Sequence, residues 1–122
     1  QNTNLTFPIV ADVDLKVARA YDMIHPDQSE TAAVRSVFII DPKKKIRLIM
    51  TYPMSVGRNF DEILRVIDAL QLSDAKRIAT PADWIPGKDV IIPPSIANEE
   101  AETLFPQGWV EHRPYLRTVN VA

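Results

Sequence analysis

The sequence predicts a mixed α/β fold, and three observations carry this prediction. An apolar segment at 34–40 has the composition of a strand buried within a sheet. A segment of alternating apolar and polar residues at 46–52 follows it after an Asp-Pro turn. A pattern of helical spacing then begins at Asn59. Strand, turn, strand and helix therefore follow one another with almost no intervening chain.

Length and composition limit the kind of protein that this can be. With 122 residues, 46% of them hydrophobic and 25% charged, the chain is long enough for one globular core. No apolar run approaches the ~20 residues that a membrane helix needs, so we expect no membrane span. A cytoplasmic location is a separate expectation. The formal charge of -2 disfavours nucleic acid as a partner. The basic run Lys43–Lys45 is expected to be a solvated turn.

The residue types that are missing narrow the chemistry further. The sequence holds no cysteine, so disulfides, thiolate metal sites and cysteine nucleophiles are excluded within it. His25 and His112 lie far apart and lack the spacing of a metal motif, so we expect neither a metal nor a cofactor. The segment 1–4 is not a signal peptide, and it lacks an initiator methionine. We expect that the chain begins partway through something longer.

The first forty residues predict two short elements before the central strand. Pro8 marks the apolar segment 5–10 as an edge or entry strand. Helical spacing predicts about two turns of helix at 13–21, with Asp12 or Asp14 as the cap. A polar loop is expected at 27–32.

The hairpin and the long helix have the clearest local signals. Pro42 fixes a turn after Asp41, whose carboxylate can bond its own backbone. Asn59 can cap the following helix, with Glu62 in the capping-box position and Asp61 paired with Arg65. Five apolar residues form the predicted stripe of this helix, namely Phe60, Ile63, Leu64, Ile67 and Leu70.

Beyond Leu72 closely spaced prolines indicate brief elements. We predict a C-terminal extension at 73–122 with a strand at 90–92 and a helix at 98–105. Trp84 and Trp109 are expected to anchor this extension by packing.

Arg35 and Arg58 are the candidate functional residues. Arg35 lies in the apolar strand, and a guanidinium taken out of water must be ion-paired or must bind an anion, so a structural ion pair is the alternative. Arg58 precedes a helix start, where a cation is unfavourable to the helix dipole. Free amides at that helix start, together with Gly57, predict an anion site. Pairing of Arg58 with Asp61 is the alternative.

Several longer motifs are specific enough for comparison with known families. They are Val34–Lys45, Thr51–Pro53, Gly57–Ile67, Leu70–Leu72, Ala79–Trp84, Val90–Pro94 and Glu99–Pro106. In this order they closely resemble the one-cysteine peroxiredoxin family of the AhpC/TSA superfamily, over nearly the whole chain. The resemblance implies the C-terminal part of a thioredoxin-like domain at 1–72. It also implies the family's small α+β C-terminal dimerisation domain at 73–122.

In that family a peroxidatic cysteine attacks the terminal oxygen of a peroxide, becomes a sulfenic acid and is reduced by an external thiol. The resemblance implies that Arg35 lowers the thiolate's pKa and polarises the peroxide, and that Arg58 is a second active-site arginine. The family's cysteine-bearing first half is absent from this sequence. We therefore expect a fragment of a thiol peroxidase for hydrogen peroxide and alkyl hydroperoxides that is inactive without that half.

The resemblance also implies a homodimer and an external thiol reductant for the parent enzyme. We expect dimer contacts at Ile46, Leu48, Met50, Tyr52 and Trp84. The alternative is a non-catalytic interaction or dimerisation module derived from a peroxiredoxin. For the fragment, the lack of the first half would expose an unpaired strand edge and an apolar face, so we expect the chain to be stable only with that half or with a partner chain.

Overall fold

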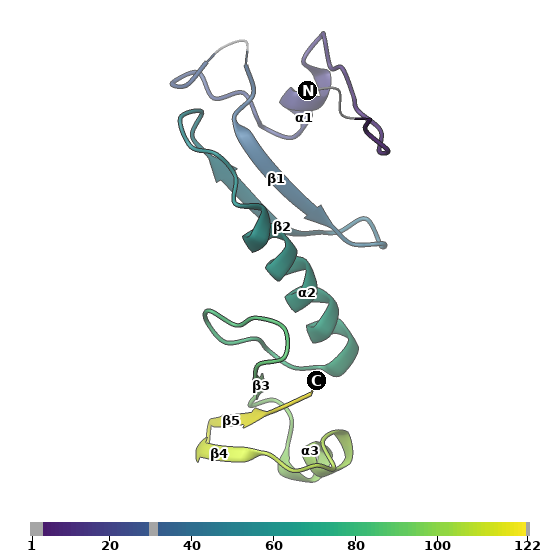
Figure 1. Ribbon diagram of the computed structural model, residues 1–122, viewed down its shortest axis with the longest axis vertical. Helices are drawn as coiled ribbons and strands as arrows, with labels where there is room; N and C mark the ends of the chain where they lie inside the picture. Colours follow the sequence, from purple (N-terminus) through teal and green to yellow (C-terminus); the bar gives the residue numbers. More distant parts are fainter. Residues whose placement is uncertain (1–3, 30–31, 122) are drawn as a thin grey trace. The chain divides into compact units, whose positions relative to one another are not determined.

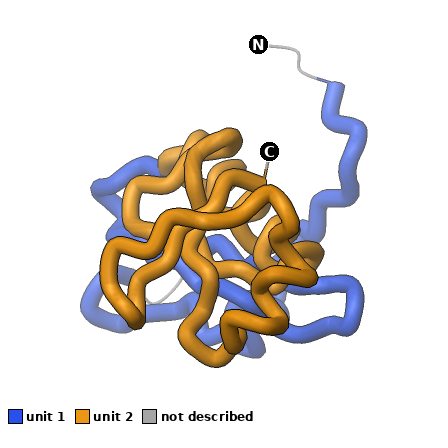
Figure 2. The backbone as a smooth tube through the Cα atoms, turned by 90° about the horizontal axis from the view of Figure 1, so that it is seen from below, with its two compact units in different colours: residues 1–58 blue, residues 59–122 orange. Residues whose placement is uncertain are grey.

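A computed structural model describes residues 4–29 and 32–121. The chain divides into two compact units, residues 1–58 and 59–122, which Figure 2 shows in different colours. We refer to them as unit 1 and unit 2, and each is described by itself.

Unit 1 is built around a β-hairpin. Strand β1 (Arg35–Ile40) pairs with strand β2 (Ile46–Tyr52) in antiparallel fashion, as the predicted strands do within one residue (Figure 1). The register aligns Arg35 with Tyr52 and shifts irregularly between Ile39 and Ile40. Five of the six residues of β1 are half-buried, and Ile40 is exposed. The strand is not fully buried as expected, because β2 is its only strand neighbour among the described residues.

The turn between β1 and β2 confirms the prediction made from Asp41 and Pro42. Asp41 Oδ1 accepts hydrogen bonds from the backbone N–H groups of Lys43 and Lys45, both at 2.9 Å. Lys44 has a φ of 62°, in the left-handed region. The basic run is exposed, as a solvated turn requires.

The segment before the hairpin differs from its prediction. Residues 5–10 form no strand, because Pro8 lacks an amide donor and no described strand lies beside them. The helix is α1 (Lys16–Ala20), shorter than the predicted 13–21. Its first amides bond to the Asp12 carboxylate, which accepts from Val17 N–H at 2.8 Å and Ala18 N–H at 2.7 Å. In the predicted loop at 27–32, residues 30–31 lie outside the described residues.

Unit 2 begins with the long helix α2 (Phe60–Lys76), which confirms the predicted helix. The Asn59 side chain accepts from Glu62 N–H at 3.2 Å, so the predicted cap is confirmed as well. The predicted Asp61–Arg65 pair is wrong, since Arg65 binds Glu62 through Nε and Nη2 at 2.5 and 2.8 Å. Glu62 lies one turn from Arg65, on the same side of the helix.

The apolar stripe of α2 is only partly buried. None of its five predicted residues is buried, and Phe60 and Leu64 are 67% and 61% exposed. The buried residues of the helix are Val66 and Ala69, which the predicted stripe did not include. Ala69 belongs to the core of unit 2, and Leu72 packs against that core. The side of the helix that carries Ala69 therefore packs against the core of unit 2. The side that carries Phe60 is not covered by other residues of this unit.

The remainder of unit 2 is a small sheet with one short helix. It contains β3 (Val90–Ile92), α3 (Asn98–Leu104), β4 (Val110–Arg113) and β5 (Leu116–Val119). The predicted strand at 90–92 and helix at 98–105 are confirmed, while the hairpin of β4 and β5 was not predicted. The strand order is β3-β5-β4, all antiparallel. All four residues of β4 are exposed, which explains why its sequence carries no apolar pattern.

Unit 2 has a core of its own. Its buried members come from every part of the unit, namely Ala69, Ile78, Trp84, Val90, Ile92, Ile96, Ala101, Phe105 and Val119. Trp109 packs against this core and is partly buried. Both tryptophans therefore pack within the extension. The proposed domain boundary at Leu72 falls within α2, and it stays a prediction.

Candidate active site

Arg35 opens strand β1 in unit 1, and its guanidinium is the main candidate for chemistry. Its Nη1 atom is buried and has no hydrogen-bond partner among the described residues. No ion pair to a described carboxylate is formed either, so the structural ion pair that the sequence left open is not seen. A buried donor without a partner costs about 1–3 kcal/mol, which stability alone would not favour.

The surroundings of Arg35 follow from the β1–β2 register. Directly paired residues of an antiparallel ladder project to the same face of the sheet. Arg35 therefore shares a face with Tyr52, and the next pair on this face is Val37 with Met50. Ile39 and Leu48 complete the face, and all six residues are half-buried. The guanidinium thus lies at one end of an apolar surface of the hairpin, here called the Arg35 face.

Arg117 shows what a buried, purely structural arginine looks like in this chain. Arg117 on β5 is only 4% exposed. Its Nη1 donates to Asn98 Oδ1 at 2.6 Å, and its Nη2 donates to the carbonyl oxygens of Ile96 at 2.6 Å and Pro93 at 3.1 Å. Sequence reasoning missed Arg117, because nothing in its local sequence separates it from an exposed arginine.

Arg58 is exposed and directly precedes the helix cap Asn59. Within the described residues it forms no hydrogen bond or ion pair, neither with Asp61 nor with any other carboxylate. In the described part of the chain, no hydrogen bond or shared partner joins Arg58 to Arg35. Gly57 has open space around its Cα, which leaves room for a ligand or another segment.

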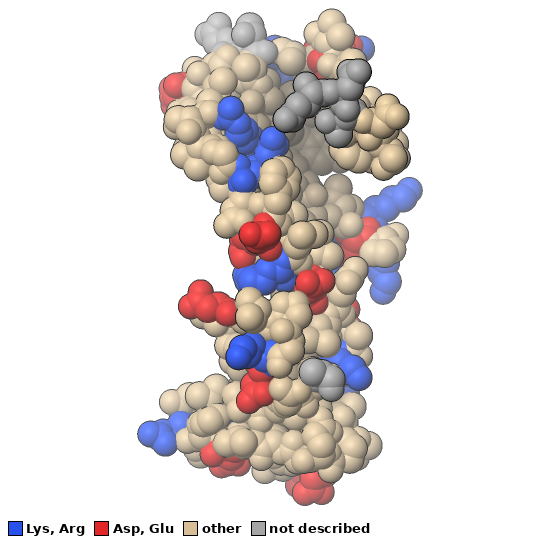
Figure 3. Space-filling model, in the orientation of Figure 1, with Lys and Arg blue, Asp and Glu red and all other residues tan. Residues whose placement is uncertain are grey.

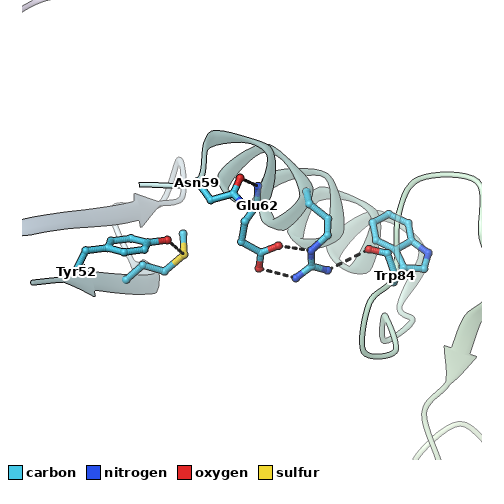
Figure 4. Close-up of polar contacts among 6 residues, drawn as sticks. Tyr52, Asn59, Glu62 and Trp84 are labelled. Atoms are coloured by element: carbon cyan, nitrogen blue, oxygen red, sulfur yellow. Dashed lines mark hydrogen bonds and ion pairs between the residues drawn. The ribbon is translucent and has the colours of Figure 1, made fainter. Parts of the chain in front are cut away.

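Tyr52 and Met50 form a polar contact on the Arg35 face. The Tyr52 hydroxyl donates to Met50 Sδ at 3.8 Å, as Figure 4 shows. Together with Leu48 these residues are half-buried, whereas Ile46 at the other end of β2 is 53% exposed. Sequence reasoning placed these four residues on one face but did not foresee the contact between hydroxyl and sulfur.

Trp84 is held inside unit 2. It is 3% exposed, and its indole Nε1 donates to the carbonyl of Lys88 at 3.0 Å. Arg65 donates from Nη1 to the Trp84 carbonyl at 3.2 Å while it also binds Glu62 (Figure 4). This arginine lowers the pKa of Glu62 below its ordinary value, chiefly by hydrogen bonding. A tryptophan this buried offers almost no exposed surface to a second chain. The dimer contacts proposed below are therefore those of β2 alone.

The remaining polar groups do not assemble a further site. His25 Nε2 bonds to the Asp22 carbonyl at 3.1 Å, and His112 Nε2 to Thr118 Oγ1 at 2.8 Å. Across residues 4–29 and 32–121 no group of three or more histidine or acidic side chains could hold a metal ion. Side chains of both signs lie on each unit on the face drawn in Figure 3. None of the described helices is long and apolar enough to cross a membrane.

Comparison with known proteins identifies the family. Residues 69–108 match the C-terminal domain of 1-Cys peroxiredoxin, and residues 1–49 match the AhpC/TSA family. The chain is 50% identical to a 1-Cys peroxiredoxin of Dictyostelium discoideum over 96% of its own length and 48% of the relative. It is 53% identical to a mitochondrial peroxiredoxin of Saccharomyces cerevisiae, covering 93% of this chain and 46% of that protein. The chain thus spans about half the length of the curated relatives it matches.

Solved structures agree in fold. A yeast mitochondrial 1-Cys peroxiredoxin, described for its thiol resolving mechanism via glutathione/thioredoxin systems, aligns with a TM-score of 0.87 at 50% identity. The alignment covers 98% of this chain and 58% of that one. A cysteine-to-serine mutant of peroxiredoxin 6 of Arenicola marina gives 0.87 at 43% identity, covering 99% and 59%. The fold is therefore thioredoxin-like, of the peroxiredoxin type, and the chain belongs to the one-cysteine peroxiredoxin family.

Proposed function

We propose that this chain is the arginine-bearing part of a thiol peroxidase whose peroxidatic cysteine lies outside it. The observation that carries the proposal is the buried Nη1 of Arg35, a permanently charged donor that no described residue satisfies. Membership of a peroxiredoxin family supports a peroxide as the substrate and a thiolate as the nucleophile. Because the sequence has no cysteine, the chain is expected to be inactive alone.

The chemistry assigned to Arg35 follows from its charge and shape. The thiolate sulfur attacks the terminal oxygen of hydrogen peroxide or an alkyl hydroperoxide, the O–O bond breaks, and the other oxygen leaves as water or an alcohol after it gains a proton. The cysteine becomes a sulfenic acid, which an external thiol reduces. A forked guanidinium can hold the thiolate and a peroxide oxygen together, which favours the thiolate and stabilises the charge on the departing oxygen.

The test combines this chain with a cysteine-bearing first half from a relative, joined as one polypeptide or mixed as two. Peroxide turnover should appear in the combination and be absent from either part alone. Arg35→Ala should then lower kcat/KM for peroxide by about a hundredfold or more, as loss of one oxyanion donor does in other enzymes.

The matched control is Arg113→Ala. Arg113 is exposed, lies in unit 2 and donates only to its neighbour's carbonyl, His112 O at 2.9 Å. This control variant should keep the turnover of the unmodified combination. A combination that turns over peroxide equally well with and without Arg35 would remove the basis of the proposal.

Arg58 is proposed as the second active-site arginine. Its exposure and its lack of a described partner leave the guanidinium available for a carboxylate or thiolate delivered by the missing half. Because Arg58 is exposed, its contribution should be smaller than that of Arg35. Arg58→Ala is expected to reduce turnover by about tenfold or less.

A homodimer is proposed through β2. Only β1 pairs with β2 among the described residues, so the opposite edge of β2 is unpaired. A second copy could add its own β2 to this edge, leaving the side chains of Leu48, Met50 and Tyr52 on the face they already occupy. Ile46, the exposed first residue of β2, would lose the largest part of its solvent-exposed surface in this dimer. Sedimentation of Ile46→Lys against the unmodified combination tests this: the substitution should weaken the dimer.

The alternative function is a non-catalytic interaction module derived from a peroxiredoxin. The absence of cysteine favours it, as do the apolar side chains that unit 1 exposes. The two functions differ in one outcome: a module binds its partner chain without any peroxide turnover, whatever half is supplied. We also propose the division at Leu72 and a cytoplasmic location, although one relative is named mitochondrial.

A further inference from the structure

Met50 carries the one thioether in the described chain whose sulfur accepts a hydrogen bond from a neighbouring side chain. The donor is the Tyr52 hydroxyl, at 3.8 Å. The other two methionines, Met23 and Met54, are also half-buried, but no described donor reaches their sulfur atoms. Exposure therefore does not distinguish the three methionines, whereas the neighbours of the sulfur do.

Met50 also lies close to the unsatisfied arginine. In the β1–β2 register it is directly opposite Val37, and Arg35 is opposite Tyr52. Met50 and Arg35 are thus diagonal neighbours on the Arg35 face, with Cα atoms about 7–8 Å apart, within reach of two long side chains. The Tyr52 hydroxyl is the described donor to the sulfur, while Arg35 Nη1, on the diagonal position, bonds neither to this sulfur nor to any other described acceptor.

We propose that Met50 is a modification site, the methionine of this chain that a peroxide oxidises first. Sulfur attacks one peroxide oxygen, an S–O bond forms, and the O–O bond breaks. The thioether loses two electrons and becomes a sulfoxide, and the peroxide is reduced to water or an alcohol once its departing oxygen gains a proton. In this step the Tyr52 hydroxyl, 3.8 Å from Sδ, would turn its hydrogen bond from the sulfur to that departing oxygen.

The product of this reaction, Met50 sulfoxide, would also find hydrogen-bond donors in the structure. A sulfoxide oxygen accepts hydrogen bonds far better than a thioether sulfur, and here it can accept from Tyr52 and from Arg35 Nη1. Oxidation would therefore give Arg35 Nη1 the hydrogen-bond acceptor that it lacks. A guanidinium bonded in this way would no longer be available to bind a peroxide. Only this last consequence rests on the proposed function; the oxidation itself needs a peroxide and the hairpin.

The experiment follows oxidation of all three methionines by peptide mass spectrometry after limited doses of hydrogen peroxide. It uses the 122-residue chain alone. It also uses the chain combined with the first half of a relative in which serine replaces the peroxidatic cysteine. Met50 sulfoxide is expected to form about three to ten times faster than that of Met23 or Met54, the factor that one net hydrogen bond supplies. In concentrated urea the three rates should become equal, because the neighbours are lost.

Tyr52→Phe tests the role of the hydroxyl, and Tyr115→Phe, an exposed tyrosine of unit 2, is its matched control. Tyr52→Phe should slow Met50 oxidation by about three- to tenfold and leave Met54 unchanged, whereas Tyr115→Phe should change neither. Native Met50 reacting no faster than Met23 and Met54 would overturn the proposal. So would equal Met50 rates in the two variants. These readouts use no turnover, so a failed peroxidase assay and a failed oxidation assay are separate results.

Discussion

Arg35 and Tyr52 are direct partners in the β1–β2 register, yet the guanidinium Nη1 of Arg35 has no described hydrogen-bond partner. Arg117 is the opposite case, since three neutral oxygens accept from its guanidinium. Neutral oxygens thus satisfy the Arg117 guanidinium, whereas no described residue satisfies Arg35 Nη1. A folded domain gains nothing from an unsatisfied buried donor, which is why we propose that Arg35 serves chemistry.

Replacing Arg35 with methionine separates stability from function. Arg35→Met removes a buried donor without a partner and keeps an apolar chain beside Val37. The free energy of unfolding should therefore stay the same or rise by up to about 3 kcal/mol. Hydrogen exchange of the β1 and β2 amides measures the local change. A loss of more than about 1 kcal/mol would mean that Arg35 is a structural residue.

Replacing Arg117 with methionine should have the reverse effect. Arg117→Met leaves the carbonyl oxygens of Pro93 and Ile96 and the Asn98 side chain without their donor. The bond to the Ile96 carbonyl is buried, and a buried acceptor left unpaired costs about 1–3 kcal/mol, so unit 2 should lose at least about 1 kcal/mol. Urea denaturation followed by tryptophan fluorescence reports this, because both tryptophans lie in unit 2. An unchanged midpoint would show that water replaces the donor easily.

The Glu62–Arg65 pair should make stability depend on pH. Hydrogen bonding to Arg65 lowers the pKa of Glu62 below its ordinary value of 4.5. The pair therefore stabilises the fold fully above that value, and the contribution is lost as the pH falls through the lower pKa of the folded state. The difference in melting temperature between the unmodified chain and Glu62→Gln should shrink between about pH 7 and about pH 3. A difference that is constant with pH would contradict the pair.

Trp84 should be a major stabilising residue of unit 2. Trp84→Ala removes a side chain that is 3% exposed from the core, which typically costs about 3–5 kcal/mol. Trp84→Phe keeps most of the buried ring but loses the bond from Nε1 to the Lys88 carbonyl, and should cost about 1–2 kcal/mol. Fluorescence of the remaining Trp109 follows unfolding. Equal losses in the two variants would show that the hydrogen bond, not the buried area, dominates.

Asn59 should stabilise helix α2 through its side-chain cap. Its side chain accepts from Glu62 N–H, so Asn59→Ala should destabilise α2 by about 1 kcal/mol. Asn59→Asp retains a side-chain oxygen acceptor at the same place and is the control. The free energy of unfolding from urea titration should separate the two variants. If both lose stability equally, the side-chain cap does not stabilise the helix.

Much of the secondary structure could be predicted from the sequence, because it depends on local chemistry. Asp41 with Pro42 set the turn, alternation set β2, and Asn59 with helical spacing set α2. Each of these signals acts over a few residues, so it can be read along the chain. The hairpin of β4 and β5 escaped because β4 is exposed throughout and its pairing depends on residues of another strand.

The candidate site divides in the same way. The sequence by itself determined that Arg35 lies in an apolar strand, that no cysteine is present, and that the motifs are those of a one-cysteine peroxiredoxin. Only the tertiary structure decided that Nη1 of Arg35 lacks a partner, that Arg117 has three, and that Tyr52 bonds the sulfur of Met50. The physical reason is that burial and hydrogen bonding of a side chain depend on atoms brought in from distant parts of the chain.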